Sequence, residues 1–317
     1  MPSGPRVLLV LFLGIVVTAA GVPSASGQGY PAFSLGDFWE YAVEFRLDSL
    51  PGFENVSGSL VATGDARVQV TEAAPDDARL SWAGNLSLQG RFTLPGETAD
   101  ATISGTIAMA YEEQRRAPYF LPIAFDAQAV LDGAITFIVT VPYSATLQLN
   151  ATAPPDPTSP TYPLAEGNRT FMTTTTLATN LSVDFIGMTI QNSTVEEATS
   201  EVRWIVTPSA SVEVPAGTFS GSQVWMEALS GFVPSPFQVL LPGAVQVTHH
   251  SDLVGSPVLY QFLANGTEVG SASLQTYSYA SNESPPFWQN PFFLGGILAI
   301  PIALLLYRYW RERRRGL

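Results

Sequence analysis

Apolar and polar side chains alternate along the stretch Arg79-Leu80-Ser81-Trp82-Ala83-Gly84-Asn85-Leu86-Ser87-Leu88-Gln89-Gly90-Arg91-Phe92. Successive side chains of a β-strand point to opposite faces, so this alternation predicts a strand with one buried face. The buried face would carry Leu80, Trp82, Leu86, Leu88 and Phe92. The opposite, solvated face would carry Arg79, Ser81, Asn85, Ser87, Gln89 and Arg91.

The same period of two recurs along the middle of the chain. Turn signals separate the runs, and Asn265-Gly266 is a hairpin signal. Strands with one apolar face need a cover, so a sandwich, a barrel and a strongly curved half-barrel all satisfy the pattern. The predicted fold class is therefore mainly β, a curved antiparallel sheet followed by one C-terminal transmembrane helix. The other alternating runs each place their apolar residues on one face of a predicted strand. These residues are Trp39, Tyr41, Val43, Phe45 and Leu47; Ile103, Ile107, Met109 and Tyr111; Ile135, Phe137, Val139 and Val141; and Phe171, Leu177, Leu181, Val183 and Phe185.

Helix is scarce in this region. Arg116 to Val130 and Phe232 to Val245 are the two helix candidates, and both contain prolines. Residues 151–165 are rich in proline and form either a long loop or a linker. Because the strands on both sides are alike, we expect one sheet with an excursion at this point.

Both ends of the chain carry membrane-directed signals. Arg6 precedes a short apolar run, and small residues follow to Gly27, which predicts a cleaved signal peptide over residues 1–27 rather than an uncleaved anchor. Residues 287–307 are long and apolar enough for one transmembrane helix. Residues 308–317 form a short cytoplasmic tail under the positive-inside rule, with Arg308, Arg311, Arg313, Arg314 and Arg315 as the membrane-orienting residues. A processed sorting signal is the alternative, but retention as a single-pass anchor in the cell membrane is the default.

Residues 28–286 make up the predicted extracytoplasmic domain, and this domain is strongly acidic. It contains 26 acidic residues and eight arginines. Nucleic-acid binding needs clustered cations, so nucleic acid is not an expected partner. The chain has no cysteine, which excludes disulfides, thiol catalysis and thiolate metal sites.

Eight of the nine asparagines lie in Asn-x-Ser/Thr triplets, and all eight fall in the predicted outer domain. Asn85, Asn150 and Asn180 lie on the polar phase of their strands, where a glycan would point away from the core. The pattern predicts an N-glycosylated cell-surface protein, and with the absence of lysine it favours an archaeal origin. The predicted glycosylation sites are Asn55, Asn85, Asn150, Asn168, Asn180, Asn192, Asn265 and Asn282.

Three short segments occur in a characteristic order. They are Gly36-Asp37-Phe38-Trp39-Glu40-Tyr41, Val212-Glu213-Val214-Pro215-Ala216-Gly217-Thr218-Phe219, and His250-Ser251-Asp252-Leu253-Val254-Gly255-Ser256-Pro257-Val258-Leu259-Tyr260. This order resembles uncharacterised archaeal-type exported, membrane-anchored surface proteins, whose sheets are similar to the curved half-barrel of lipoprotein carriers. The resemblance implies a concave face that holds something apolar.

Candidate catalytic groups are few. His249 and His250 are adjacent on a predicted strand, so they would point to opposite faces and share a metal poorly. We expect an exposed pair there. Glu112-Glu113 and Arg115-Arg116 are interpreted as a solvated hairpin tip. No catalytic residue, metal site or cofactor is predicted.

The sequence therefore favours a surface-anchored, N-glycosylated, non-enzymatic binding or interaction module. Its expected partners are membrane lipid through the C-terminal helix, and either an apolar ligand or another envelope protein. The alternatives are a structural component of the envelope and an extracytoplasmic hydrolase. Trp39, Trp82, Trp204 and Trp225 are expected in the core, although a sheet face lined by them could hold a ligand.

Overall fold

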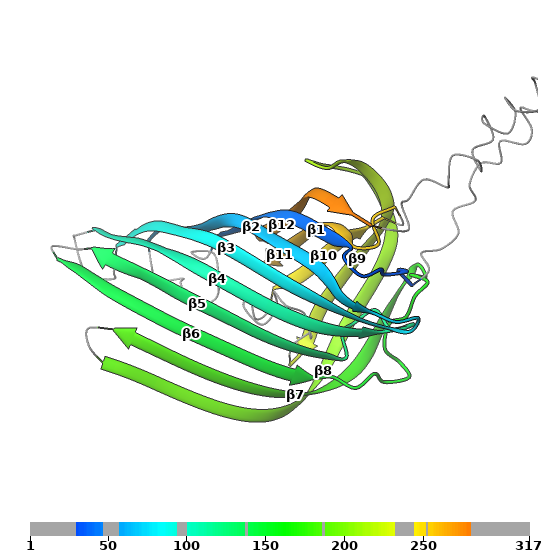
Figure 1. The fold of residues 1–317 in the computed structure, drawn as a ribbon, viewed down its shortest axis with the longest axis horizontal. Helices are drawn as coiled ribbons and strands as arrows, with labels where there is room; N and C mark the ends of the chain where they lie inside the picture. The colour runs from blue at the N-terminus through cyan, green and yellow to red at the C-terminus, as the bar shows by residue number, and fades with distance from the viewer. Residues whose placement is uncertain are drawn as a thin grey trace, which may run out of the picture.

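The computed structural model describes residues 30–46, 57–93, 100–136, 139–185, 188–231, 244–251 and 253–279, which fold into twelve β-strands (Figure 1). In these residues no helix is both long and apolar enough to span a bilayer. The strands are β1 (Phe38–Arg46), β2 (Ser57–Ala73), β3 (Asp77–Thr93), β4 (Asp100–Arg116), β5 (Ala124–Thr136), β6 (Thr140–Thr152), β7 (Gly167–Phe185), β8 (Met188–Val214), β9 (Gly217–Ser230), β10 (Val245–His250), β11 (Pro257–Ala264) and β12 (Thr267–Ser278).

The strands form one closed antiparallel barrel. Each strand pairs with its neighbours in the chain, and β1 closes the ring by pairing with β12. The fold is thus mainly β with an antiparallel sheet, as the sequence predicts. The pattern allows a sandwich, a barrel or a curved half-barrel, and the chain forms the closed barrel. Where the ring is complete, closure removes the free sheet edges that an open sheet would leave.

The barrel is lopsided because its strands differ greatly in length. Strands β2 to β8 have 13 to 27 residues, whereas β10 has six and β11 has eight. Residues Met188 to Ser200 of β8 pair with β7 alone, and β9 joins β8 only from Glu201 onward. We call the part where β1 and β9–β12 complete the ring the closed half. The rest of β2–β8, which extends past the short strands in Figure 1, is the open half.

The main core fills the closed half. Trp39, Tyr41, Val43 and Phe45 of β1 all point inward and are at most 4% exposed. The Trp39 indole donates a hydrogen bond to the carbonyl of Val254 at 2.8 Å, which satisfies its one polar atom in an apolar site. Full burial of one such side chain contributes about 1.5–3 kcal/mol, so this strand anchors the closed half.

Two loops pack together on the closed half. The β4–β5 loop contributes Phe120, and the β6–β7 loop contributes Tyr162, in a second apolar cluster around Trp204. The backbone N–H of Phe120 donates to the carbonyl of Pro160 at 2.9 Å, and the N–H of Tyr162 donates to the carbonyl of Pro118 at 2.7 Å. The proline-rich segment is therefore a loop of the barrel, and the strands on both sides of it belong to one sheet.

The helix expected over Arg116 to Val130 is wrong. After Arg116 the chain makes a turn through Pro118, and β5 begins at Ala124. Prolines lack the N–H that a helix needs, and the alternation from Phe125 to Ile135 satisfies a strand instead. The second helix candidate lies mostly outside the described residues, and its last residue, Val245, begins strand β10.

The predicted Asn-Gly hairpin is confirmed. Asn265 and Gly266 connect β11 to β12, and both have positive φ, at 50° and 77°. A two-residue turn of this kind requires positive φ at both positions, which asparagine and glycine tolerate best.

Candidate functional site

The inner face of β2–β6 is organised in registered rows that run across the strands. One row joins Ala66, Gly84, Met109, Ala129 and Leu147, which are paired strand to strand. The next row, toward the closed half, joins Val68, Trp82, Tyr111, Ala127 and Leu149 in the same way. Small and large side chains are therefore placed side by side on one apolar face.

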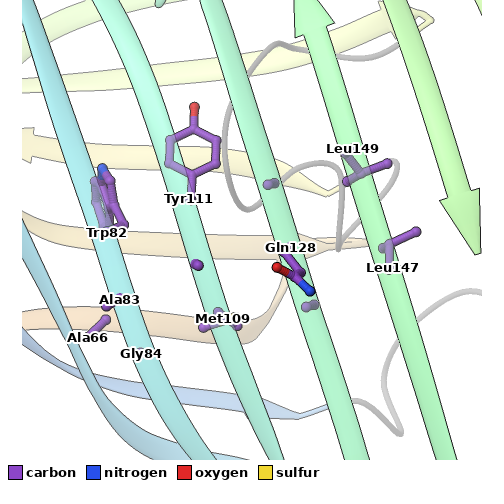
Figure 2. Close-up of a pocket in the computed structure, with 12 residues that line it drawn as sticks. Ala66, Trp82, Ala83, Gly84, Met109, Tyr111, Gln128, Leu147 and Leu149 are labelled. Carbon is purple, nitrogen blue, oxygen red and sulfur yellow. The ribbon is translucent and has the colours of Figure 1, made fainter.

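An apolar pocket lies between these two rows (Figure 2). The small side chains of Ala66, Ala127 and Ala129 leave the hollow, and Gly84 adds no side chain to it. The pocket has a volume of about 40 Å³, which is room for roughly three water molecules. Its larger walls are Trp82, Met109, Tyr111, Leu147 and Leu149.

The apolar inner face continues from the pocket into the open half. The next row toward the open half contains Ile107, Leu131, Ala145, Val183 and Ile190. The first four are only partly buried, and Ile190 is 63% exposed. From β4 to β8 this inward-facing row stays accessible, although its β3 member Leu86 is only 2% exposed. An accessible inward-facing row is unusual for a core, so it is the feature that distinguishes the open half.

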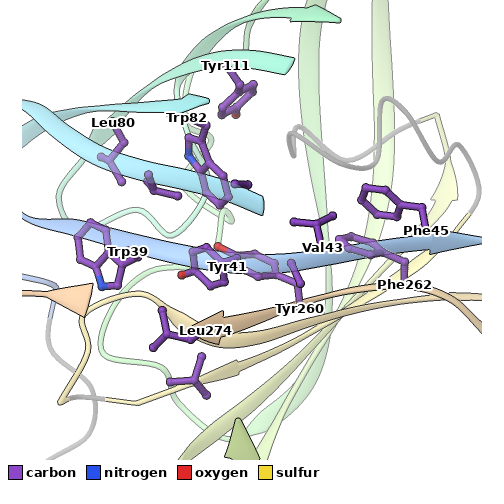
Figure 3. Packing of buried hydrophobic residues seen from close by; sticks show 14 of the residues in the cluster. Trp39, Tyr41, Val43, Phe45, Leu80, Trp82, Tyr111, Tyr260, Phe262 and Leu274 are labelled. Carbon is purple, nitrogen blue, oxygen red and sulfur yellow. The ribbon is translucent and has the colours of Figure 1, made fainter. Parts of the chain in front are cut away.

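Aromatic rings of the closed half pack against Trp82 and Tyr111, two of the walls of this apolar pocket (Figure 3). Trp82 stacks on Tyr41 with ring centroids 6.0 Å apart and meets Tyr111 edge-on at 6.3 Å. Tyr260 meets both Tyr41 and Trp82 edge-on. Burial raises the pKa of the Tyr41 phenol, whose hydroxyl donates to the carbonyl of Pro257 at 2.8 Å.

A buried ion pair lies beyond these rings. The Nε of Arg115 donates to the Oε1 of Glu113 at 2.7 Å, and the Tyr111 hydroxyl donates to the other carboxylate oxygen at 3.2 Å. The Glu113 side chain is 1% exposed and that of Arg115 is 14% exposed. Burial is the largest single effect on the pKa of Arg115 and would lower it, but the adjacent Glu113 carboxylate together with Tyr162 and Tyr260 outweighs burial, so the pKa is raised and the guanidinium stays charged.

The expectation of a solvated hairpin tip at this point is thus half wrong. Glu112 and Arg116 are exposed on the outer face, as expected, whereas Glu113 and Arg115 lie inside the barrel. The strand alternation continues to the end of β4, so alternate charged residues are forced inward. Sequence alone offered one signal, because Glu113 and Arg115 share the phase of Tyr111.

The two histidines lie on opposite faces of β10, as predicted, but the expected exposure is wrong. His250 faces inward and is 5% exposed, and its Nε2 lies 3.0 Å from the Thr248 hydroxyl. Burial lowers its pKa to about 3, with Arg115 and His249 adding smaller effects in the same direction. His249 is 9% exposed and lies on the outer face between Gln223 and Gln261, and burial lowers its pKa too.

Three of the four tryptophans expected in the core are buried there. Trp39 and Trp204 are at most 1% exposed, and Trp82 is 6% exposed. Trp225 is only half-buried, because it lies on the opposite phase from the buried neighbours Val224 and Met226.

Six of the predicted glycosylation sites fall within the described residues, and all six side chains are exposed. Asn85, Asn150 and Asn180 lie on the outward phase of β3, β6 and β7. Asn192 is paired with the inward-facing Leu181, and it is exposed because it lies in the open half. The other two described sites are Asn168 in β7 and Asn265 in the β11–β12 turn.

The remaining predicted features lie outside the described residues. They are Asn55, Asn282, the signal peptide, the transmembrane segment 287–307 and the arginines of the tail. Within the described ranges, no group of three or more His, Asp or Glu side chains is placed to hold a metal ion.

Comparison with known proteins gives no match: no family model, no curated protein and no solved structure is similar to this chain.

Proposed function

We propose that this chain is a cell-surface-anchored, N-glycosylated, non-enzymatic binding module that takes an apolar ligand on the inner face of β2–β6. The observation that carries the proposal is the apolar pocket between Trp82 and Leu147, which continues into rows of inward-facing but accessible side chains. Barrels bind ligands in their mouths, where side chains leave the interior unfilled.

The energetics favour an extended apolar ligand. Removing apolar surface from water contributes about 25 cal/mol per Å². The pocket alone would hold only a short segment of a hydrocarbon chain. The accessible side chains of Ile107, Leu131 and Ile135 offer further apolar surface along the same face. A chain-like ligand would cover both, and a compact one would cover only the pocket.

The ends of the barrel suit membrane attachment from one side. Tyr30 is the first described residue, and its ring contacts Phe33, which in turn contacts Trp39. Tyr279 is the last described residue, and its ring also contacts Trp39. Both ends of the barrel therefore leave from the closed half. A membrane segment beginning at residue 287 would hold the closed half toward the bilayer and leave the open half facing away from it.

The sequons support exposure of this domain outside the cell. The side chains of Asn85, Asn150 and Asn180 point away from the apolar face, so glycans at these sites would leave the pocket free. Glycans at these three sites and a ligand on the inner face would therefore not compete for space, whereas Asn192 lies on the inward phase of β8, in the open half.

The absence of cysteine allows a direct test with a single introduced thiol. Ala129→Cys places a thiol at the pocket, and Ala108→Cys places one on the exposed outer face of β4, next to β5. Each full-length protein is held in lipid nanodiscs and labelled with a polarity-sensitive thiol dye. Titration with dodecanol should shift the dye emission saturably at position 129 and leave position 108 unchanged. Equal responses at the two positions would show only partitioning into lipid and would refute the proposal.

A further inference from the structure

A second, smaller cavity lies inside the closed half, next to the apolar pocket. Trp82 lines both spaces. Tyr111 lines the apolar pocket, and its hydroxyl bonds to Glu113, which lines the small cavity. Two residues along a strand span about 7 Å, so the two spaces are a short distance apart on the same face of β4. The polar side chains around the small cavity are Glu113, Arg115, Gln246, Thr248, His250 and Tyr260.

The small cavity is electrically balanced. The charge of Arg115 is matched by Glu113, whose carboxylate also accepts the hydrogen bond from Tyr111. His250 is buried, with the Phe120 ring 5.1 Å away, and its lowered pKa keeps the imidazole neutral near pH 7. A further charge brought into this space would lose its hydration without a free partner of opposite sign. The cavity therefore selects against charged groups.

The small cavity still offers hydrogen bonds. The Nε of Arg115 donates to Glu113. Its two Nη groups have no hydrogen-bond partner among the residues that the structure describes, so they can donate to a guest in the cavity. The imidazole of His250 and the hydroxyl of Thr248 line the same space and bond to each other, and each keeps one further donor or acceptor position for a guest. A guest with one oxygen that both donates and accepts would suit these groups.

The size of the cavity sets a limit on this guest. Its volume is about 30 Å³, which is room for roughly two water molecules. A hydroxymethyl group fits this limit, whereas a sugar or a phosphate ester does not.

We propose that the ligand is a neutral amphiphile with a small hydroxyl head, of the long-chain alcohol class. Its head would occupy the cavity beside Arg115 and His250, and its apolar chain would follow the pocket and the inner face of β4–β6. This inference rests on the proposed function, because it assumes that the inner face binds an apolar chain.

The test compares probes that share one chain and differ in their heads. The full-length Ala129→Cys protein, labelled and held in nanodiscs, is titrated with dodecanol, sodium dodecanoate and dodecyltrimethylammonium at pH 8. Partitioning of each probe is corrected with the Ala108→Cys protein. We expect dodecanol to bind at least tenfold more tightly than either charged probe. Equal binding of all three would overturn this inference while leaving the proposed function intact, and binding of none would overturn both.

A charge switch sharpens the same test. Glu113→Gln leaves the charge of Arg115 unmatched, so the preference for dodecanol over dodecanoate should fall by at least tenfold. The control Glu112→Gln changes the neighbouring exposed residue of β4 and should leave the preference unchanged. The double variant Glu113→Gln/Arg115→Gln restores neutrality and should restore the preference. A Glu113→Gln protein that folds and keeps the original preference would contradict the inference. If this variant does not fold, the probe series on the Ala129→Cys protein with Glu113 intact decides the matter.

Discussion

The closed and open halves of this barrel are made from the same kind of strand, yet they differ in what their inner faces do. In the closed half, Tyr41 and Phe262 meet side chains from the opposite wall and are fully buried. In the open half, Ile107 and Leu131 occupy the same inward phase and remain partly exposed. An amphipathic strand therefore yields core only where an opposite wall is long enough to cover it. Where that wall is short, the same pattern yields an accessible apolar surface.

The largest expected effect concerns charges on the two faces of one strand. Arg115→Ala would leave the Glu113 carboxylate buried without its partner and should lower the free energy of unfolding by about 3–5 kcal/mol. Arg116→Ala removes an exposed pair with Asp77 and should cost at most about 1 kcal/mol. Urea denaturation followed by tryptophan fluorescence measures both. Similar losses for the two variants would mean that the inner pair is solvated.

The next effect compares identical leucine truncations in the two halves. Leu274→Ala removes a fully buried side chain from the closed half and should cost about 2–5 kcal/mol. Leu131→Ala removes a partly exposed side chain from the open half and should cost about 1 kcal/mol or less. The same denaturation experiment checks the pair, and equal costs would show that the open half is packed like the closed half.

A smaller effect, graded with pH, distinguishes the inner and outer faces of β10. The folded pKa of His250 is about 3, below the ordinary value of 6.5, so the unfolded chain takes up the proton first as the pH falls. The stability due to neutral His250 is full above about pH 6.5 and is lost toward pH 3, at no more than about 1.4 kcal/mol per pH unit.

The corresponding experiment measures urea denaturation between pH 7 and pH 4.5. His250→Gln should flatten the pH dependence, whereas His249→Gln on the outer face should flatten it less. An unchanged slope in the His250→Gln protein would show that the imidazole is already hydrated in the folded state.

The sequence predicted much of the fold because the alternation in residues such as Leu80 to Leu88 is enforced by burial. The sequence does not decide between an open and a closed sheet, because the alternation of side chains does not show which strand pairs with the other edge of β1. The same phase argument, followed to the end of β4, would have placed Glu113 inside. Charged residue types favour solvent, so the sequence predicts a solvated pair where the barrel buries Glu113 and Arg115.

The candidate site was less predictable than the fold. The resemblance to curved half-barrels implied an apolar concave face, but the pocket depends on which alanines and glycines meet across strands. The hollow forms because Ala66, Gly84 and Ala129 fall in one registered row. Register between distant strands is set by the whole sheet, so a single strand's pattern cannot supply it.

The central claim is that the inner face of β2–β6 is open to an apolar guest. The dodecanol titration of the labelled Ala129→Cys protein, set against Ala108→Cys, tests it most directly. The account predicts a saturable emission shift at position 129 with no shift at position 108. A flat response at position 129 in the folded, nanodisc-held protein would contradict it.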